Sequence, residues 1–258
     1  MPADLGLEGK RVLITGGSRG IGAACAKAFA EAGAAVLIQY RDRAEAAERL
    51  LGRLPAPAAF GHLAWGADLA NPEEIPALFE FVRERWGGLD VLVNNAGIWV
   101  EGPLAKLDGA GLAEHLAATL ALNLAAPFHL VHEALPLFGD SADPSVINVS
   151  STAGQRGESR YSAYAASKGA LISATKSWAV EMAPKIRVNA VAPGWVVTDM
   201  TAEALEGEEG ARAAAGIPLG RIATADDIAG PILFLASRLA GHITGEVLNV
   251  NGGSVLCG

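Results

Sequence analysis

Short runs of β-branched residues and leucine alternate along the chain with longer alanine-rich stretches in which apolar residues recur at helical spacing. The short runs are apolar almost throughout, which is typical of parallel strands that helices cover on both faces. Strands are predicted at Arg11–Thr15, Ala35–Gln39, His62–Ala67, Val91–Asn94, Val146–Val149, Arg187–Ala192 and Val247–Val250. Helices are predicted near residues 21–32, 44–54, 73–86, 112–137, 163–182 and 226–237. This alternation predicts an α/β fold, a doubly wound domain with a parallel seven-stranded sheet flanked by helices.

No linker, composition break or internal repeat interrupts the pattern, so residues 1–258 are expected to form a single domain. Thr224 and Asp227 have the spacing of a capping box for the last helix, with Asp in place of the usual Glu. Residues 203–216 differ from the rest, since they are small, acidic and punctuated by glycine. They predict a mobile flap or weak helix, within a substrate flap that spans residues 198–220.

Composition excludes several classes of protein. With 258 residues, 51% of them hydrophobic, the chain can bury a sizeable core and is not disordered. A net charge of −8 argues against broad contact with nucleic acid. No run of about 18 apolar residues predicts a membrane span, and the beginning of the chain lacks the apolar core of a signal peptide. A cytoplasmic protein is expected, in which the distant Cys25 and Cys257 are buried or incidental thiols.

The first predicted strand leads directly into a glycine-rich loop, residues 15–22, and a helix follows. Gly16, Gly20 and Gly22 lack a Cβ where the backbone must turn sharply and approach a ligand. The free N–H groups at the start of the next helix favour a pyrophosphate. Glycine can also serve turn geometry alone, but its place after the first strand of a βα repeat indicates a dinucleotide site. The loop residues assigned to it are Gly16, Ser18, Arg19, Gly20, Ile21 and Gly22.

The end of the second strand indicates which nicotinamide cofactor is bound. An acidic residue there would bind the ribose of NAD, whereas a basic one pairs with the 2′-phosphate of NADP. Here the strand ends without a carboxylate, and Arg41 follows, with Arg19 of the glycine loop within reach of the same phosphate. Asp42 would bind ribose if the register differed by two residues. NADP(H) is therefore expected, with NAD(H) as the alternative.

Tyr164 and Lys168 are four residues apart on a predicted helix and so lie on one face. A phenol titrates near pH ~10, and a nearby ammonium lowers that pKa, which suits it to acid–base chemistry. The alternative is a core tyrosine beside a lysine that reaches solvent. Upstream, the segment 148–154 contains Ser150 and Ser151 after a strand, where ligands bind in open α/β sheets. A nucleophilic serine is disfavoured because no G-x-S-x-G elbow surrounds it.

A metal site is not expected. His129 and His132 are three residues apart on one predicted helix, but no third ligand is near them in the sequence.

These motifs together resemble the short-chain dehydrogenase/reductase family, with a match over essentially the whole chain and a Rossmann fold implied. The glycine loop, Asn94–Gly97, Ser151 and the Tyr164/Lys168 pair fall in the family order. The further matching residues are Asp68, Leu69, Asn123, Pro193, Gly194 and Thr198.

The resemblance implies a role for each of these residues. Tyr164 would be the catalytic acid/base, and Ser151, thirteen residues before it, would orient and polarise the substrate carbonyl. Lys168 would bind the nicotinamide ribose and tune Tyr164, and Asn123 would hold a water of the proton relay. The cofactor would further contact Asp68 and Leu69, then Asn95, Ala96 and Gly97, and finally Pro193, Gly194, Val196 and Thr198. In isolation, Asp68 would be read as a helix cap and Asn123 as a polar residue bonded to backbone, and it is their registration with the other motifs that favours the cofactor and relay roles.

The substrate stays open between two groups that relatives of this family use. One is a small free carbonyl or alcohol, and the other is a 3-oxoacyl group on acyl carrier protein or CoA. Reductases of the carrier protein tend to have basic residues before the fifth strand, where this chain has Asp140 and Asp143. Arg156 and Arg160 would compensate in part, and Trp99 and Trp195 are candidate pocket walls or packing aromatics. The small carbonyl is the first choice.

A function of a different class is that of a catalytically silent protein that senses NADP, but such relatives typically lose the tyrosine or the lysine.

Family resemblance also implies a homotetramer or homodimer, with the region of residues 251–253 at an interface.

Overall fold

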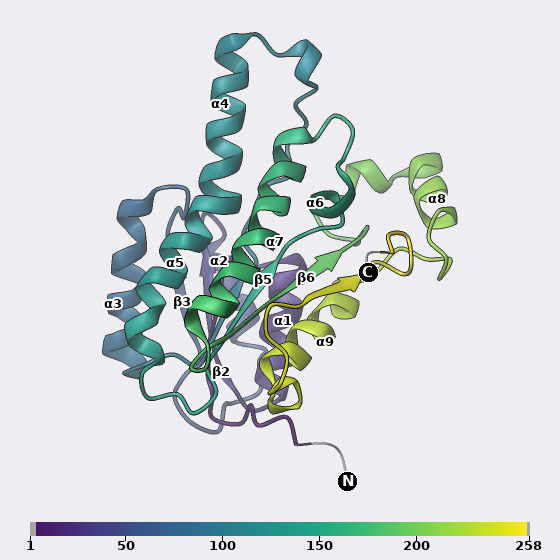
Figure 1. Ribbon diagram of the computed structural model, residues 1–258. Coiled ribbons are helices and arrows are strands. Elements are labelled where there is room, and N and C mark those ends of the chain that lie inside the picture. Colours follow the sequence, from purple (N-terminus) through teal and green to yellow (C-terminus); the bar gives the residue numbers. More distant parts are fainter. Residues whose placement is uncertain (1–3, 257–258) are drawn as a thin grey trace.

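The computed structural model describes residues 4–256, in which seven strands form one parallel sheet (Figure 1). The strands are β1 (Arg11–Ile14), β2 (Ala35–Tyr40), β3 (Leu63–Gly66), β4 (Val91–Asn94), β5 (Ser145–Val149), β6 (Arg187–Pro193) and β7 (Val247–Val250). Their order across the sheet is β3-β2-β1-β4-β5-β6-β7. This confirms the predicted doubly wound α/β fold. The winding direction reverses between β1 and β4, so a binding crevice is expected there at the carboxyl ends of the strands.

Helices cover both faces of the sheet. The α-helices are α1 (Gly20–Glu31), α2 (Ala44–Leu51), α3 (Ile75–Trp86), α4 (Gly109–Leu120), α5 (Ala126–Ala134), α6 (Ala153–Arg156), α7 (Ser162–Met182), α8 (Gly207–Ala215) and α9 (Ala225–Ala236). The 3-10 turns are η1 (Pro72–Glu74), η2 (Leu104–Lys106), η4 (Leu135–Phe138), η5 (Glu203–Leu205) and η6 (Arg238–Ala240). Neighbouring residues of a strand pack into opposite layers, as their alternating directions require. In β1, Leu13 packs in the core with α3, α5 and α7, and Val12 and Ile14 pack in the core with α1, α2 and α9.

The helix predicted near 112–137 is not continuous. It consists of α4, a π-helical turn η3 (Ala121–Ala125), α5 and the 3-10 turn η4. Pro127 explains the interruption, because it has no N–H to donate to the carbonyl of Asn123, four residues earlier. π turns of this kind occur frequently at functional sites, and this one contains the fully buried Asn123.

Two further predictions concern the last third of the chain. The capping box at the start of α9 is confirmed, with both the Thr224 and the Asp227 side chains bonded to backbone N–H groups. Residues 203–216 form η5 and α8 and pack closely, since a Cβ on Gly210 would lie 2.1 Å from the carbonyl oxygen of Leu205. Within residues 4–256, no helix is both long enough and apolar enough to cross a membrane.

The sequence predicts that the two cysteines are buried or incidental thiols. Cys25 is buried in α1, and this burial raises the pKa of its thiol well above the usual range. Cys257 lies outside the described residues.

Candidate active site

The glycine loop connects β1 to α1. Gly16 and Gly20 have φ angles of +61° and +53°, which other residues rarely adopt. A Cβ on Gly22 would lie 2.4 Å from the carbonyl oxygen of Gly16, so only glycine fits there. The residue before α1 is Arg19, whose side chain does not cap the helix. The loop is therefore a close backbone cradle with N–H groups of the first helical turn free for an anionic group, which fits a pyrophosphate.

Side chains from two neighbouring strands hold this loop in place. The hydroxyl of Thr15 accepts hydrogen bonds from the N–H groups of Asn95 and Ala96, both at 2.9 Å. The side-chain amide of Asn95 in turn donates to the carbonyl oxygens of Thr15 (2.8 Å) and Gly16 (3.2 Å). Gln39, at the end of β2, accepts a bond from the N–H of Gly16 at 3.1 Å. Because Gln39 is used in this way and is buried, the side chains that follow it form the outer part of the groove.

A groove runs over the carboxyl ends of β1, β2 and β4. It is lined by most of the predicted cofactor-binding residues, namely Gly16, Ser18, Arg19, Gly20, Ile21, Arg41, Asp68, Leu69, Asn95, Ala96, Gly97 and Thr198. It is also lined by Gln39, Arg43, Asp199 and Met200, which the sequence analysis missed. Arg43 was detectable in principle, because it follows Arg41 by two residues at the end of the same strand.

Three half-exposed arginines surround the outer part of this groove. Arg41 pairs with Asp42 at 2.7 Å, and this contact raises the pKa of the Arg41 guanidinium. Arg19 and Arg43 both contact the same carboxylate oxygen of Asp199, at 3.3 and 3.4 Å.

Asp68, at the side of the groove, does not cap a helix. Its carboxylate accepts a bond from the N–H of Ala70, whereas Asn71 caps the following 3-10 turn η1.

A second cavity, of about 320 Å³, lies beside the groove and shares Met200 with it. Ser151 follows β5 and Tyr164 lies in the first turn of α7, and both line this cavity together with Gly194. The structure therefore brings the predicted serine and tyrosine to one wall. Trp99 and Trp195, the candidate pocket walls or packing aromatics, line the same cavity and lie outside both core clusters.

Tyr164 and Lys168 differ from the sequence-based expectation in their electrostatics. Burial raises the pKa of Tyr164, while a hydrogen bond with Ser151 acts in the opposite direction. The Lys168 Nζ atom lies 5.9 Å from the centre of the Tyr164 ring. It donates a hydrogen bond to the carbonyl oxygen of Val149 at 2.8 Å. Burial lowers the pKa of Lys168 to about 8. The net shift of the Tyr164 pKa is therefore upward, opposite to the lowering by Lys168 that the sequence predicts, and burial is its largest cause.

Three hydrogen bonds to two residues hold the Asn123 side chain in the π turn. Its side-chain oxygen accepts from the N–H of Ile98 at 2.8 Å, and its amide donates to the Ile98 carbonyl (2.9 Å) and to Ser167 (3.2 Å). Gly97 lies between this residue and Lys168. A Cβ there would meet the side-chain oxygen of Asn123 at 3.1 Å and the Lys168 ammonium at 3.4 Å. Glycine at this position leaves the space above both side chains open.

The segment that follows β6 forms the other side of the groove. Thr198 lies beside the glycine loop, where a Cβ on Gly20 would come within 3.3 Å of the Thr198 methyl group. The Val196 carbonyl accepts a bond from the hydroxyl of Thr201 at 2.5 Å, and Val196 itself is buried, as is Pro193. Among residues 4–256, no group of three or more His, Cys, Asp or Glu side chains is arranged to hold a metal ion.

Comparison with known proteins agrees with this geometry. Residues 16–254 match the profile of a family described as "Enoyl-(Acyl carrier protein) reductase". The 3-oxoacyl-[acyl-carrier-protein] reductase of Vibrio cholerae is 38% identical over 252 residues, which cover 96% of this chain and 98% of the relative. The protein of the same name from Thermotoga maritima is 36% identical over 257 residues, covering 97% and 99%.

Two solved structures have the same architecture. A short-chain dehydrogenase/reductase from Brucella melitensis, described as a glucose/ribitol dehydrogenase, superimposes with a TM-score of 0.89 at 33% identity, covering 97% of this chain and 98% of that one. The ligand-free aldohexose dehydrogenase of Thermoplasma acidophilum has a TM-score of 0.84 at 30% identity, covering 97% and 95%. The fold and the groove are those of a nicotinamide-dependent oxidoreductase. The chain belongs to the short-chain dehydrogenase/reductase family.

Proposed function

We propose that the protein reduces a small free carbonyl compound with NADPH, or oxidises the corresponding alcohol with NADP. The observation that supports this most strongly is the position of Ser151 and Tyr164 on a cavity that adjoins the glycine-loop groove. A substrate in the cavity and a nicotinamide in the groove would meet at the shared wall.

The chain's own residues would place the carbonyl and move one proton. Because burial raises the pKa of Tyr164, its phenol is protonated at neutral pH and suits a proton donor to the carbonyl oxygen. The Ser151 hydroxyl would hold the same oxygen and favour the charge that develops on it. When bound, the reduced nicotinamide supplies the hydride.

Lys168 and Asn123 would assist these steps by binding the cofactor ribose and a water molecule. The space that Gly97 leaves open above them suits a ribose, whose hydroxyls the Lys168 ammonium would bind. Asn123 would orient a water of the proton relay, and its bonds to Ile98 fix its position. The remaining groove residues, from the glycine loop to Thr198, would hold the rest of the cofactor.

A preference for NADP(H) over NAD(H) is supported by charge. Arg19, Arg41 and Arg43 line the outer groove, where a phosphate would accept bidentate bonds from guanidinium groups. Asp42, the residue that would favour ribose of NAD, forms an ion pair with Arg41.

A second candidate is reduction of a 3-oxoacyl thioester on acyl carrier protein or CoA. The printed names of the Vibrio and Thermotoga relatives favour it. Against the carrier protein stands the acidic segment before β5, in which Asp140 is exposed; the charge of Asp143 is offset by its ion pair with Arg187 at 3.0 Å.

We further propose that residues 198–220 act as a substrate flap, since Met200, Arg212 and Ile217 line the substrate cavity.

We also propose a homotetramer or homodimer, which would bury apolar side chains that a single chain exposes. Val180 on α7 is 81% exposed, and Phe128 on α5 is 48% exposed. Light scattering of the purified protein tests this, and a strictly monomeric protein at micromolar concentration would contradict it.

The central experiment follows NADPH oxidation with small diketones, aldehydes, keto sugars and acetoacetyl-CoA, with NADH in parallel. Turnover of a free carbonyl with preference for NADPH is expected. Faster turnover of the thioester by more than tenfold would favour the second candidate. Tight NADPH binding without turnover of any carbonyl would instead indicate a catalytically silent sensor.

A further inference from the structure

The five tryptophans of the chain fall into two groups. Trp86 and Trp178 belong to the hydrophobic core and Trp65 packs against it. Trp99 and Trp195 belong to neither core cluster, are only partly buried, and line the cavity of Ser151 and Tyr164. Large aromatic side chains outside the core and on a cavity wall offer their surface to a ligand.

These side chains form a corner with fixed geometry. The ring of Trp99 stacks on that of Tyr161 with a centroid distance of 4.2 Å and an interplanar angle of 10°. Trp99 also meets Trp195 edge to face, at 5.8 Å and 89°. The three residues come from three separate segments: the loop after β4, the residue before α7 and the loop after β6. We name Trp99, Tyr161 and Trp195 the aromatic corner.

Two anchors hold the Trp99 loop on either side. On one side, Ile98 exchanges two hydrogen bonds with Asn123, at 2.8 and 2.9 Å. On the other side, the N–H of Gly102 donates to the carbonyl of Arg160 at 2.9 Å, and the Arg160 guanidinium pairs with Glu101. Arg160 directly precedes Tyr161, so the same contacts place both stacked rings. The corner is therefore in place before a ligand arrives, and little conformational entropy is lost on binding.

The arginine side chains that line the cavity are paired with carboxylates, so the cavity does not select for a charged substrate. Arg156 is paired with Glu158 at 2.6 Å, and both side chains line the cavity. The other arginine of the lining, Arg212, is largely exposed and lies 3.7 Å from Glu208. The largest uncharged side chains that line the cavity together with Ser151 and Tyr164 are the aromatic Trp99 and Trp195.

We infer that the preferred substrate is an aryl ketone or aldehyde, with a planar ring directly attached to the reacting carbonyl. The ring would lie against Trp99 and Trp195 while the carbonyl oxygen meets Tyr164 and Ser151. This rests on the proposed function and narrows its substrate class. An aliphatic carbonyl of the same size would fill the cavity but would lose the stacking contacts, which depend on planarity.

The test compares three ketones that differ only beside the reacting carbon: ethyl benzoylacetate, its cyclohexyl counterpart and ethyl acetoacetate. Relative to the cyclohexyl compound, we expect the wild-type protein to have a kcat/KM at least about tenfold higher for the phenyl compound. Trp99→Leu is expected to lower this phenyl-to-cyclohexyl ratio by about tenfold, and Trp99→Phe to retain most of it. Trp65→Leu, which replaces a tryptophan remote from the cavity, is the matched control and leaves the ratio unchanged. Thermal unfolding verifies that each variant is folded.

A second readout separates this inference from the proposed function. Isothermal titration calorimetry with 1-phenylethanol and with 1-cyclohexylethanol, in the absence of nucleotide, measures binding without turnover in wild type and in Trp99→Leu. Selective binding of the phenyl compound that Trp99→Leu abolishes supports the aromatic corner even if no carbonyl is reduced. A ratio near one in the wild type, or one that Trp99→Leu leaves unchanged, overturns the inference. Turnover of aliphatic carbonyls in that case would leave the proposed function standing.

Discussion

Arginine side chains lie at both ends of the strands of the parallel sheet, but they differ in burial and in the number of hydrogen bonds they make. At the amino ends of the strands, Arg11 and Arg187 are nearly buried, with side chains 12% and 10% exposed. At the carboxyl ends, Arg19, Arg41 and Arg43 have side chains 49–59% exposed, and their contacts are to exposed carboxylates.

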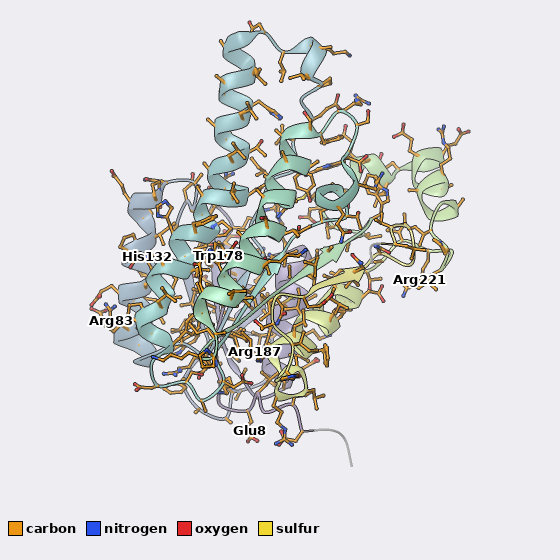
Figure 2. All side chains as sticks on the ribbon, in the orientation of Figure 1. Glu8, Arg83, His132, Trp178, Arg187 and Arg221 are labelled. Carbon is orange, nitrogen blue, oxygen red and sulfur yellow. The ribbon has the colours of Figure 1, made fainter. Side chains whose placement is uncertain are left out.

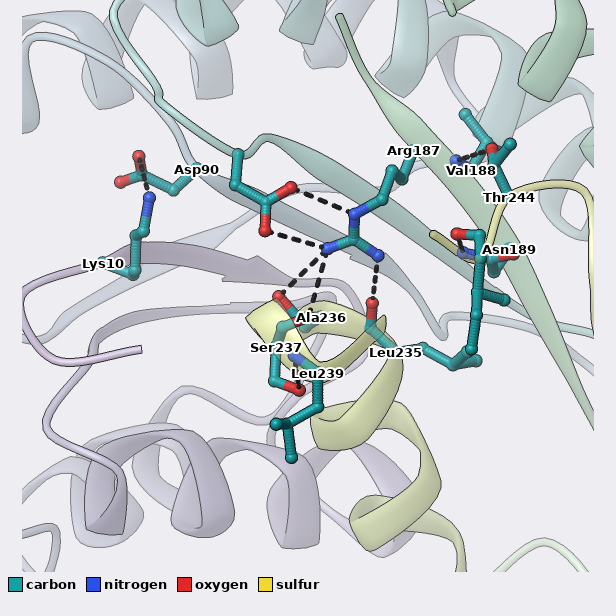
Figure 3. A network of polar contacts seen from close by, with 12 residues as sticks. Lys10, Asp90, Arg187, Val188, Asn189, Leu235, Ala236, Ser237, Leu239 and Thr244 are labelled. Atoms are coloured by element: carbon teal, nitrogen blue, oxygen red, sulfur yellow. Dashed lines mark hydrogen bonds and ion pairs between the residues drawn. The ribbon is translucent and has the colours of Figure 1, made fainter. Parts of the chain in front are cut away.

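The difference is in the number of donors that remain free. The Arg187 guanidinium donates to Asp143 and to the carbonyl oxygens of Leu235, Ala236 and Ser237 at the end of α9 (Figure 3). Its hydrogen-bonding capacity is used within the fold. Each groove arginine side chain has one partner among the described residues and keeps donors for a phosphate. Position at the carboxyl ends of the strands and free donors together distinguish the arginines proposed to bind a phosphate from the structural ones, whereas residue type alone does not.

The largest effect is expected at the carboxyl edge. Tyr164→Phe removes the hydroxyl that would donate the proton, and kcat should fall by about 10²- to 10⁴-fold. NADPH affinity, measured by nucleotide fluorescence, should stay within about twofold, because the ring and its packing are kept. Turnover near that of the wild type would contradict the assignment of Tyr164.

The opposite outcome is expected at the amino edge. Arg187→Met leaves three carbonyl oxygens at the end of α9 without their donor, and should lower the free energy of unfolding by about 3 kcal/mol. Urea unfolding measures this, and the activity per folded molecule should not change. Arg83→Met is the matched control on the outer surface of α3, where an exposed ion pair contributes less than about 1 kcal/mol (Figure 2). Equal losses for the two variants would contradict a structural role specific to Arg187.

Arg43 tests whether free donors indicate a phosphate site. Arg43→Ala should weaken NADPH binding by about tenfold and change NADH binding by less than twofold, since only NADPH carries the 2′-phosphate. Isothermal titration with both cofactors measures this. Arg49→Ala on the outer side of α2 is the control, because within residues 4–256 this exposed arginine forms its ion pair with Glu45 alone. Equal weakening of both cofactors by Arg43→Ala would place its effect in general groove charge.

Sequence patterns predict more of the fold than of this site. The strands were predictable because strands buried on both faces are apolar throughout, and glycine spacing identified the loop after β1. The break at Asn123 was not predicted, because the apolar pattern continues through the π turn and the only local signal is Pro127. The roles of Gln39, Arg43 and Asp199 depend on which way side chains turn at the strand ends. Residue spacing does not determine that direction.

A pH profile compares the two ends of the strands in another way, because a buried arginine stays charged at every accessible pH, whereas a buried lysine loses its proton at a lower pH than a free one. Burial lowers the pKa of Lys168 to about 8, so its ammonium is lost as the pH rises through that value. For carbonyl reduction, kcat/KM should be flat below pH 8 and fall severalfold by pH 9. Stopped-flow or initial-rate measurements across pH 6–10 follow it. A profile that stays flat to pH 10 would contradict a need for the charged lysine.

The smallest effect is expected at Asp199, whose carboxylate occupies the space between the Arg19 and Arg43 guanidinium groups. A phosphate that binds these arginines must displace or approach that carboxylate, which competes for the same donors and repels the ligand. Exposed ion pairs contribute less than about 1 kcal/mol, so Asp199→Asn should tighten NADPH binding by only about threefold.

NADH binding should not change in this variant, and the gain for NADPH should shrink at high salt, which screens exposed charges. Asp226→Asn on the exposed side of α9 removes the same charge away from the groove and is the control. Weaker NADPH binding in Asp199→Asn would reverse the interpretation. Asp199 would then align the two arginines for the phosphate instead of competing with it, and their free donors would depend on a carboxylate more than 150 residues away in the chain.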